Sequence, residues 1–261
     1  MDPHYFGESN HQLFGIYHPP KGVERHHGIL LCPPGPQEYM WSHMAFRKLA
    51  ALLAREGFHV LRFDYYGTGD SGGDCEASSI AEWRANLVDA VADLKECSGV
   101  TKVSVVGLRL GAALAALAPL TASNLVLWEP VVDGKLYIDE LRATHERTFS
   151  ALLFPPTIPA CHCGGDLLGF AFPPALEAEI DDINLVAGVR SRSDHIALVI
   201  SDERPEYAQL RERLQQDAAA GGPSFEYYHV PDESYSQHRD AMLLSTQVLQ
   251  AMTSVLARRT R

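Results

Sequence analysis

Short apolar runs rich in β-forming residues alternate along this chain with longer segments of helical period. This alternation constrains the fold strongly, because it predicts a mostly parallel, twisted sheet with helices on both faces. The expected strands are 12–18, 28–32, 58–65, 102–108, 124–131, 195–201 and 225–230. The expected helices are 44–55, 80–95, 110–119, 205–220 and 240–257. With 261 residues the chain can bury one large core, so we expect a single α/β domain over 1–261.

The alternation fails between about 148 and 189, where prolines and glycines interrupt both periods. In open α/β sheets, ligands bind at the carboxyl ends of the strands, and a segment inserted there roofs the pocket. We therefore expect a small cap-like insertion over 148–189. The alternative is a long surface excursion that takes no part in ligand binding.

The balance of charge excludes one class of partner. Acidic residues outnumber basic ones by 33 to 22, and the net charge is −11 at pH 7. No run of lysines and arginines offers a surface to a phosphate backbone, so nucleic acid is not an expected partner. The first residues lack the pattern of a signal peptide, and no apolar stretch of about 18 residues occurs. We expect a cytoplasmic protein without a membrane span.

The five cysteines are odd in number and scattered, which favours reduced thiols over a disulfide framework. Cys161, His162 and Cys163 form the one local cluster of metal-binding residue types. Zinc requires four ligands at wider spacing, and no second cluster supplies the others. We therefore expect a loop at this position and no metal site.

The segment from Gly67 to Gly72 has the G-x-G-x-x-G spacing of a dinucleotide-binding loop and follows an expected strand. In that motif the glycines open a helix whose amino terminus holds the pyrophosphate. Here Gly73 and Asp74 continue the loop and add acidic charge. A nicotinamide or flavin cofactor is therefore not expected, and no other cofactor is indicated.

The segment from Val103 to Ala116 combines an apolar strand, a tight turn and an alanine-rich helix. The turn is flanked by Gly107 and Gly111, which allow strand and helix to approach closely. Such a turn directs its central residue into a pocket at the amino terminus of the helix. The central residue of this turn is Arg109.

Four stretches of the chain are similar to one known superfamily: 32–39, 61–71, 107–111 and 127–134. On them the chain resembles the α/β hydrolases, and within these the exosortase A system-associated hydrolases, type 2. The resemblance covers residues 5–145 closely and the remainder loosely. It implies the α/β-hydrolase fold, an esterase- or thioesterase-like origin, and arginine at the turn as a trait of the group.

Arg109 stands where a working hydrolase of this fold carries a serine. Serine attacks an acyl carbon after a histidine takes its proton, while a carboxylate orients the imidazole. A guanidinium remains protonated and has no lone pair to offer, so it is a donor and a charge and not a nucleophile. Hydrolysis through an ordinary acyl-enzyme is therefore not expected.

Other parts of the hydrolytic machinery have candidates. The loop at Gly35 and the backbone amide of Leu110 are expected to supply donors to an oxyanion. Asp202 follows the strand 195–201, where the acid of a triad stands, although a solvated helix cap before Pro205 explains it equally well. Chain order makes His238 the candidate histidine. The alternative is that one of the twelve histidines falls after the last strand by chance.

Three functions remain open. In the first, the chain binds an acyl or other carboxylate-bearing small molecule, free or on a carrier, and Arg109 anchors the anion. In the second, Asp202 and His238 activate water directly against an ester or thioester, without a covalent intermediate. In the third, the protein is a non-catalytic structural partner, and Arg109 pairs with Asp64, Asp70 or Glu38 inside the former pocket.

Overall fold

The computed structural model describes residues 1–74, 76, 78–150, 165–231 and 246–260. Its main sheet has eight strands in the order β1-β2-β4-β3-β5-β6-β9-β10. The strands are β1 (Asp2–Phe6), β2 (Leu13–His18), β3 (His27–Cys32), β4 (His59–Phe63), β5 (Lys102–Leu108), β6 (Thr121–Trp128), β9 (Arg192–Ile200) and β10 (Ser224–His229). β2 is antiparallel to both of its neighbours, and the strands from β4 to β10 are parallel.

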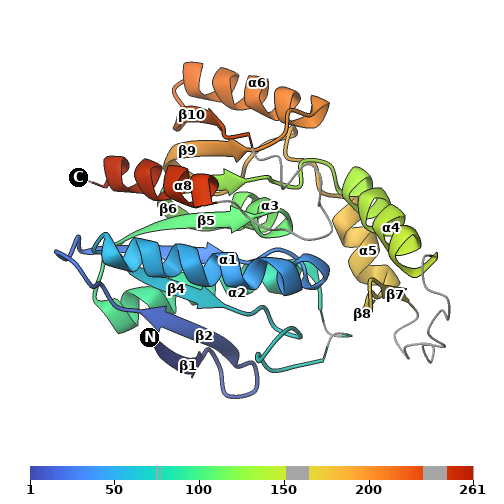
Figure 1. The fold of residues 1–261 in the computed structure, drawn as a ribbon, viewed down its shortest axis with the longest axis horizontal. Coiled ribbons are helices and arrows are strands. Elements are labelled where there is room, and N and C mark those ends of the chain that lie inside the picture. Colours follow the sequence, from blue (N-terminus) through green and yellow to red (C-terminus); the bar gives the residue numbers. More distant parts are fainter. Residues whose placement is uncertain (75, 77, 151–164, 232–245, 261) are drawn as a thin grey trace.

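Helices cover both faces of this sheet (Figure 1). One face carries α1 (Pro36–Arg55) and α8 (Thr246–Arg259), whose buried side chains share one apolar cluster. The other face carries α2 (Ile80–Ser98), α3 (Leu110–Leu117) and α6 (Pro205–Ala219), which share a second cluster. The predicted α/β architecture, a mostly parallel sheet between two layers of helices, is confirmed (Figure 1).

Alternation along the central strands divides the core between these two layers. In β3, Ile29 and Leu31 face α1 and α8, whereas Leu30 and Cys32 face the opposite layer. All four side chains are fully buried, as expected for a parallel strand that is covered on both faces.

Local signals set several helix boundaries where the sequence predicted them. The Ser79 side chain accepts a hydrogen bond of 3.0 Å from the Glu82 amide and caps α2, which ends at Gly99 with a φ of 72°. The helix α6 begins at Pro205, a residue suited to the first helical position. These caps explain why the predicted starts of both helices agree with the structure.

Other boundaries differ from the prediction. The helix α1 begins at Pro36 and not at 44. The prediction missed its first turns, which bury the polar Gln37 and Glu38 and expose Met40 and Trp41. This arrangement reverses the apolar pattern on which the prediction depended. The strand β6 ends at Trp128 and not at 131, and β1 was not predicted.

The connection from β6 to β9 also departs from the predicted pattern. It contains α4 (Gly134–Ser150), the two-stranded pair β7 (Asp166–Leu167) and β8 (Phe170–Ala171), and α5 (Pro174–Asp181). Both helices lie beyond the carboxyl ends of the central strands (Figure 1). Cys161, His162 and Cys163 fall in this connection, outside the described residues. No helix in the described part of the chain is long and apolar enough to cross a membrane.

Candidate functional site

A sharp turn at the carboxyl end of β5 holds Arg109 in a strained backbone conformation. Its φ is 52° and its ψ is −119°, values that a side chain other than glycine rarely adopts. The Arg109 amide donates to the Trp128 carbonyl at 3.0 Å, and the Arg109 carbonyl accepts from the amides of Ala112 at 3.1 Å and Val131 at 3.2 Å. These bonds keep the residue between β5 and the end of β6.

The flanking glycines permit this turn. A Cβ on Gly107 would lie 2.5 Å from the Cα of Ala112, and a Cβ on Gly111 would lie 2.1 Å from the carbonyl oxygen of Pro33. Both distances are shorter than any van der Waals contact, so α3 can approach β5 and the loop after β3 only with glycine at both positions.

The guanidinium of Arg109 is bound by two carboxylates. Its Nε lies 2.9 Å from Oε1 of Glu38, in the first turn of α1, and its Nη2 lies 2.6 Å from Oε2 of Glu140, in α4. The side chain of Arg109 is only 6% exposed. The Tyr137 hydroxyl donates to the other oxygen of Glu38 at 2.9 Å, and the Tyr137 ring lies 5.3 Å from the guanidinium carbon. Tyr137 and Glu140 are three residues apart in α4 and therefore share one face.

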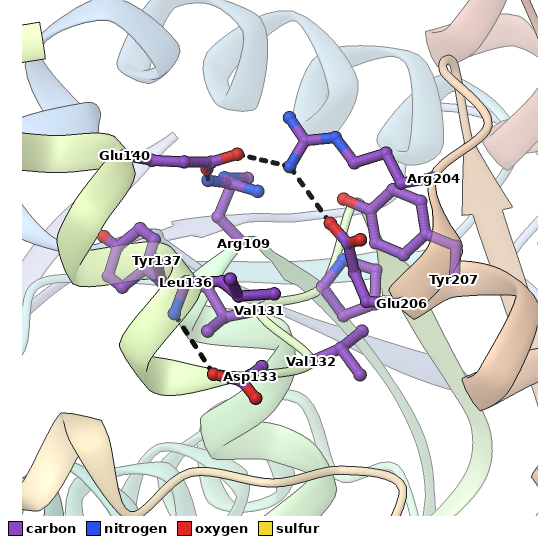
Figure 2. A pocket seen from close by; sticks show the side chains of 11 residues that line it. Arg109, Val131, Val132, Asp133, Leu136, Tyr137, Glu140, Arg204, Glu206 and Tyr207 are labelled. Atoms are coloured by element: carbon purple, nitrogen blue, oxygen red, sulfur yellow. Dashed lines mark hydrogen bonds and ion pairs between the residues drawn. The ribbon is translucent and has the colours of Figure 1, made fainter. Parts of the chain in front are cut away.

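The ion pairs continue beyond Arg109 (Figure 2). Glu140 also contacts Nη1 of Arg204, which lies 3.4 Å from Glu206 at the start of α6. Burial alone would raise the pKa of Glu140, but the guanidinium groups of Arg109 and Arg204 outweigh it and hold that pKa below its ordinary value. We call the five residues Glu38, Arg109, Glu140, Arg204 and Glu206 the Arg109 network. It joins α1, the turn after β5, α4 and the start of α6.

Little space remains beside the network in the pocket that the described residues form. This pocket, drawn in Figure 2, lies between Arg109, Tyr137, Arg204 and Tyr207. The volume open to the centre of a water molecule is about 10 Å³. A cavity of that size holds about one water molecule at most and no acyl chain.

Gly35 and Leu110, the two predicted oxyanion donors, lie next to each other. A Cβ on Gly35 would lie 3.4 Å from a terminal carbon of Leu110 and 3.1 Å from the Tyr137 hydroxyl. Because Pro33, Pro34 and Pro36 carry no N–H group, Gly35 has the only backbone donor in that loop. Binding of an oxyanion by this pair of amides stays a prediction.

The predicted pair of Asp202 and His238 cannot be placed as a pair. Asp202 follows directly after β9, at the carboxyl edge of the sheet, and is half-buried. His238 lies outside the described residues. The catalytic roles of both residues stay predictions. Within the described part of the chain, no group of three or more His, Cys, Asp or Glu side chains is arranged to hold a metal ion.

Glu129 is a further site residue that the sequence did not single out. It follows β6 with a φ of 44°, and its side chain is fully buried. One carboxylate oxygen accepts a hydrogen bond from the Ser201 amide and so fixes the end of β6 to the end of β9. Burial raises the pKa of this carboxyl, although Ser201 and the charge of Arg109 act in the opposite direction. An ionisable residue between Trp128 and Pro130, at the end of an apolar run, was the available signal.

The partners of Arg109 were predicted only in part. Glu38 is one of them, but Asp64 and Asp70 are not, because the Asp64 carboxylate accepts the Asp70 amide at 3.1 Å and has no ion pair with Arg109. Glu140 was missed because α4 was not predicted. The glycine loop 67–72 opens no helix; it folds back, with the Gly67 amide bound to the Gly72 carbonyl and the Gly72 amide bound to the Gln12 carbonyl.

Comparisons with known proteins agree with this architecture. The α/β-hydrolase family profile matches residues 27–251. A putative hydrolase from Agrobacterium vitis is similar in structure, with 18% identity, a TM-score of 0.61, and coverage of 100% of this chain and 98% of that one. Est1E from Butyrivibrio proteoclasticus, solved with ferulic acid, has 15% identity, a TM-score of 0.63, and coverage of 98% and 96%.

A proline iminopeptidase from Mycobacterium smegmatis has 13% identity, a TM-score of 0.61, and coverage of 99% of both chains. The comparison with curated proteins found no match. Structural likeness at these identities concerns the fold, whereas the profile match extends over most of the sequence. The chain belongs to the α/β-hydrolase family.

Proposed function

We propose that this chain is a non-hydrolytic member of its family, a structural or interaction partner that carries out no acyl transfer. In this proposal Arg109 occupies the position of the family's nucleophile and is the centre of a structural ion-pair network. The strained turn between Gly107 and Gly111 supports this assignment of position. The resemblance of 32–39 and 127–134 to the exosortase A system-associated hydrolases, type 2, supports it as well, since that group carries arginine at the turn.

The observation that carries the proposal is the state of the Arg109 guanidinium. A guanidinium that serves as an anion anchor needs donors directed at a vacant site. Here Nε and Nη2 are bound by Glu38 and Glu140 at 2.9 and 2.6 Å. A ligand carboxylate at this point would meet two carboxylates of the protein. The structural role is therefore favoured over the role of acyl-ligand anchor.

The network also explains why the buried position 109 carries a charged side chain. Removing one partner of a buried ion pair leaves an uncompensated charge, which costs about 3–5 kcal/mol. The Arg109 network connects the turn after β5 to α4 through Glu140, and the bond from Tyr137 to Glu38 joins α4 to α1. We propose that the chain is one domain over 1–261 and that the insertion at 148–189, together with α4, forms a cap that this network holds over the strand ends.

An activity screen with variants tests the proposal. Wild-type protein and the variants Arg109→Ser and His238→Ala are assayed against a panel of acyl esters and acyl thioesters. We expect wild-type turnover equal to that of His238→Ala, with no burst. A wild-type rate that falls about 10²-fold or more in His238→Ala would overturn the proposal, because general acid–base catalysis has that magnitude.

A further inference from the structure

A second cavity lies on the other side of the first turns of α1, away from Arg109. Its volume is about 370 Å³, enough for a small organic molecule. It lies between β2, the end of β4, the glycine loop 67–72 and α1. None of its lining residues belongs to the pocket beside Arg109. Whatever occupies this cavity therefore binds independently of the Arg109 network.

Arg62 is the buried cation of this cavity. The residue is 8% exposed, and its Nε donates to Nε2 of His18 at 3.2 Å. Burial, together with the charge of Arg62, lowers the pKa of His18 to about 4, so at neutral pH this imidazole is uncharged and accepts the bond. Among the described residues no ion pair within 4.0 Å joins the Arg62 guanidinium to a carboxylate. Burial lowers the pKa of Arg62, and the charges of Tyr39 and Asp64 on the same wall offset part of that effect. A buried guanidinium without a direct ion pair is costly, so a ligand carboxylate bonded to its terminal nitrogens would stabilise it.

Carboxylates lie on the same cavity wall. Asp64 is buried, and one of its oxygens accepts the amide of Asp70 at 3.1 Å. Asp70 is exposed, at the glycine loop. The cavity therefore presents one cation and two carboxyl groups, and a simple anion would be attracted by Arg62 and repelled by both aspartates. A simple cation would leave the donors of Arg62 unsatisfied.

The rest of the wall combines three apolar side chains with Tyr39 and His43 of α1. Phe14 and Ile16 contribute from β2 and Phe63 contributes from β4, where Ile16 and Arg62 are paired in register. Rings and branched side chains next to a few directed polar groups are typical of a small-molecule site. An occupant that matches all three features carries an anionic group, a cationic group and an apolar body.

We propose that this cavity binds a small zwitterion with an apolar side chain, of the size of an α-amino acid. Its carboxylate accepts from the terminal nitrogens of Arg62, and its ammonium group donates to Asp70 and Asp64. Its side chain packs against Phe14, Ile16 and Phe63.

Calorimetric titration of the full chain tests the chemistry of the occupant. The probes are L-leucine, L-phenylalanine and L-tryptophan, compared with 3-phenylpropanoate, which lacks the ammonium group, and phenethylamine, which lacks the carboxylate. We expect one-to-one binding of at least one amino acid and affinities at least about tenfold weaker for the two truncated analogues, the effect of losing one charge-assisted bond. No saturable binding of any amino acid, or equal affinity for 3-phenylpropanoate and L-phenylalanine, would overturn the proposal.

Two variants test the location. Arg62→Met removes the charge at similar length, and Asp70→Asn changes an exposed loop residue whose replacement leaves the core intact. Each is expected to weaken amino-acid binding about tenfold or more. The matched controls are Arg55→Met and Asp74→Asn, which replace exposed residues outside the cavity lining. Unchanged affinity in Asp70→Asn and Arg62→Met would overturn the assignment of the site.

Discussion

The Nε of Arg109 lies 2.9 Å from Oε1 of Glu38, so the turn after β5 is bound to the first turn of α1. A cation at the amino terminus of a helix opposes the helix dipole, at a cost of about 0.3–1 kcal/mol. Arg109 precedes α3, and the carboxylates of Glu38 and Glu140 place negative charge beside it at the amino terminus of this helix. The arginine is thereby tolerated where the fold otherwise favours an anion.

The stability of the protein should depend on Glu140 at low pH. The pKa of Glu140 is held below its ordinary value in the folded state, so its contribution is present above the ordinary carboxyl pKa and is lost as pH falls through the folded value. Glu140→Gln should therefore be less stable than wild type at pH 7, and the difference should shrink as pH falls below about 4. Urea denaturation at several pH values measures this. Asp139→Asn, an exposed neighbour, is the control, and an equal loss in both variants would contradict the prediction.

A second pH dependence follows from His27. Its side chain bonds to Ser104 at 2.8 Å, and burial, with the charges of Lys102 and Arg25, lowers its pKa to about 4. Between about pH 6.5 and pH 4 the His27 imidazole binds a proton in the unfolded state but not in the folded state. The free energy of unfolding therefore falls as the pH falls through this range. The slope is at most about 1.4 kcal/mol per pH unit for one proton.

The His27→Gln variant should have a smaller slope between about pH 6.5 and 4, and the remainder should come from His18, whose pKa is also lowered to about 4. The exposed neighbour His26 provides the matched control, His26→Gln, in which the slope should persist. The measurement is the free energy of unfolding across this pH range. A slope in His27→Gln as steep as that of wild type would contradict the prediction and show that other groups cause it.

A serine-directed fluorophosphonate should leave the turn unlabelled. The residues between Gly107 and Gly111 are Leu108, Arg109 and Leu110, none of which carries a hydroxyl group. Mass mapping after incubation detects an adduct, with an active serine esterase as the positive control. A stoichiometric adduct on a serine of the described site would place a nucleophile that the structure does not indicate.

Regular patterns made most of the sheet predictable from sequence. The bounds of β5 were predicted as Lys102–Leu108, because an apolar run, broken only by Ser104, leads into the turn that begins at Gly107. The helices α2, α3 and α6 begin at the predicted residues, since serine, the glycine turn and proline mark those starts. Period and capping are local properties, and local properties are readable along one chain.

The composition of the site was less predictable, because it depends on contacts between distant segments. Glu38 was anticipated as a partner of Arg109, but Glu140 reaches Arg109 only through the course of α4. Glu129 lies inside an expected strand, and its side chain is buried because β6 and β9 pair in the sheet and their ends lie side by side. No periodicity along the sequence encodes such contacts between distant segments.

The unfolding free energy of Arg109→Met, measured without ligand against wild type at pH 7, tests the central claim most directly. If Arg109 is a structural partner of Glu38 and Glu140, the variant should lose about 3–5 kcal/mol, because Glu38 remains without its cation and Glu140 keeps only Arg204. Adding Glu38→Gln to this variant should recover part of the loss. A variant as stable as wild type, or more stable, would contradict the account and show that Arg109 is held at the turn for a ligand.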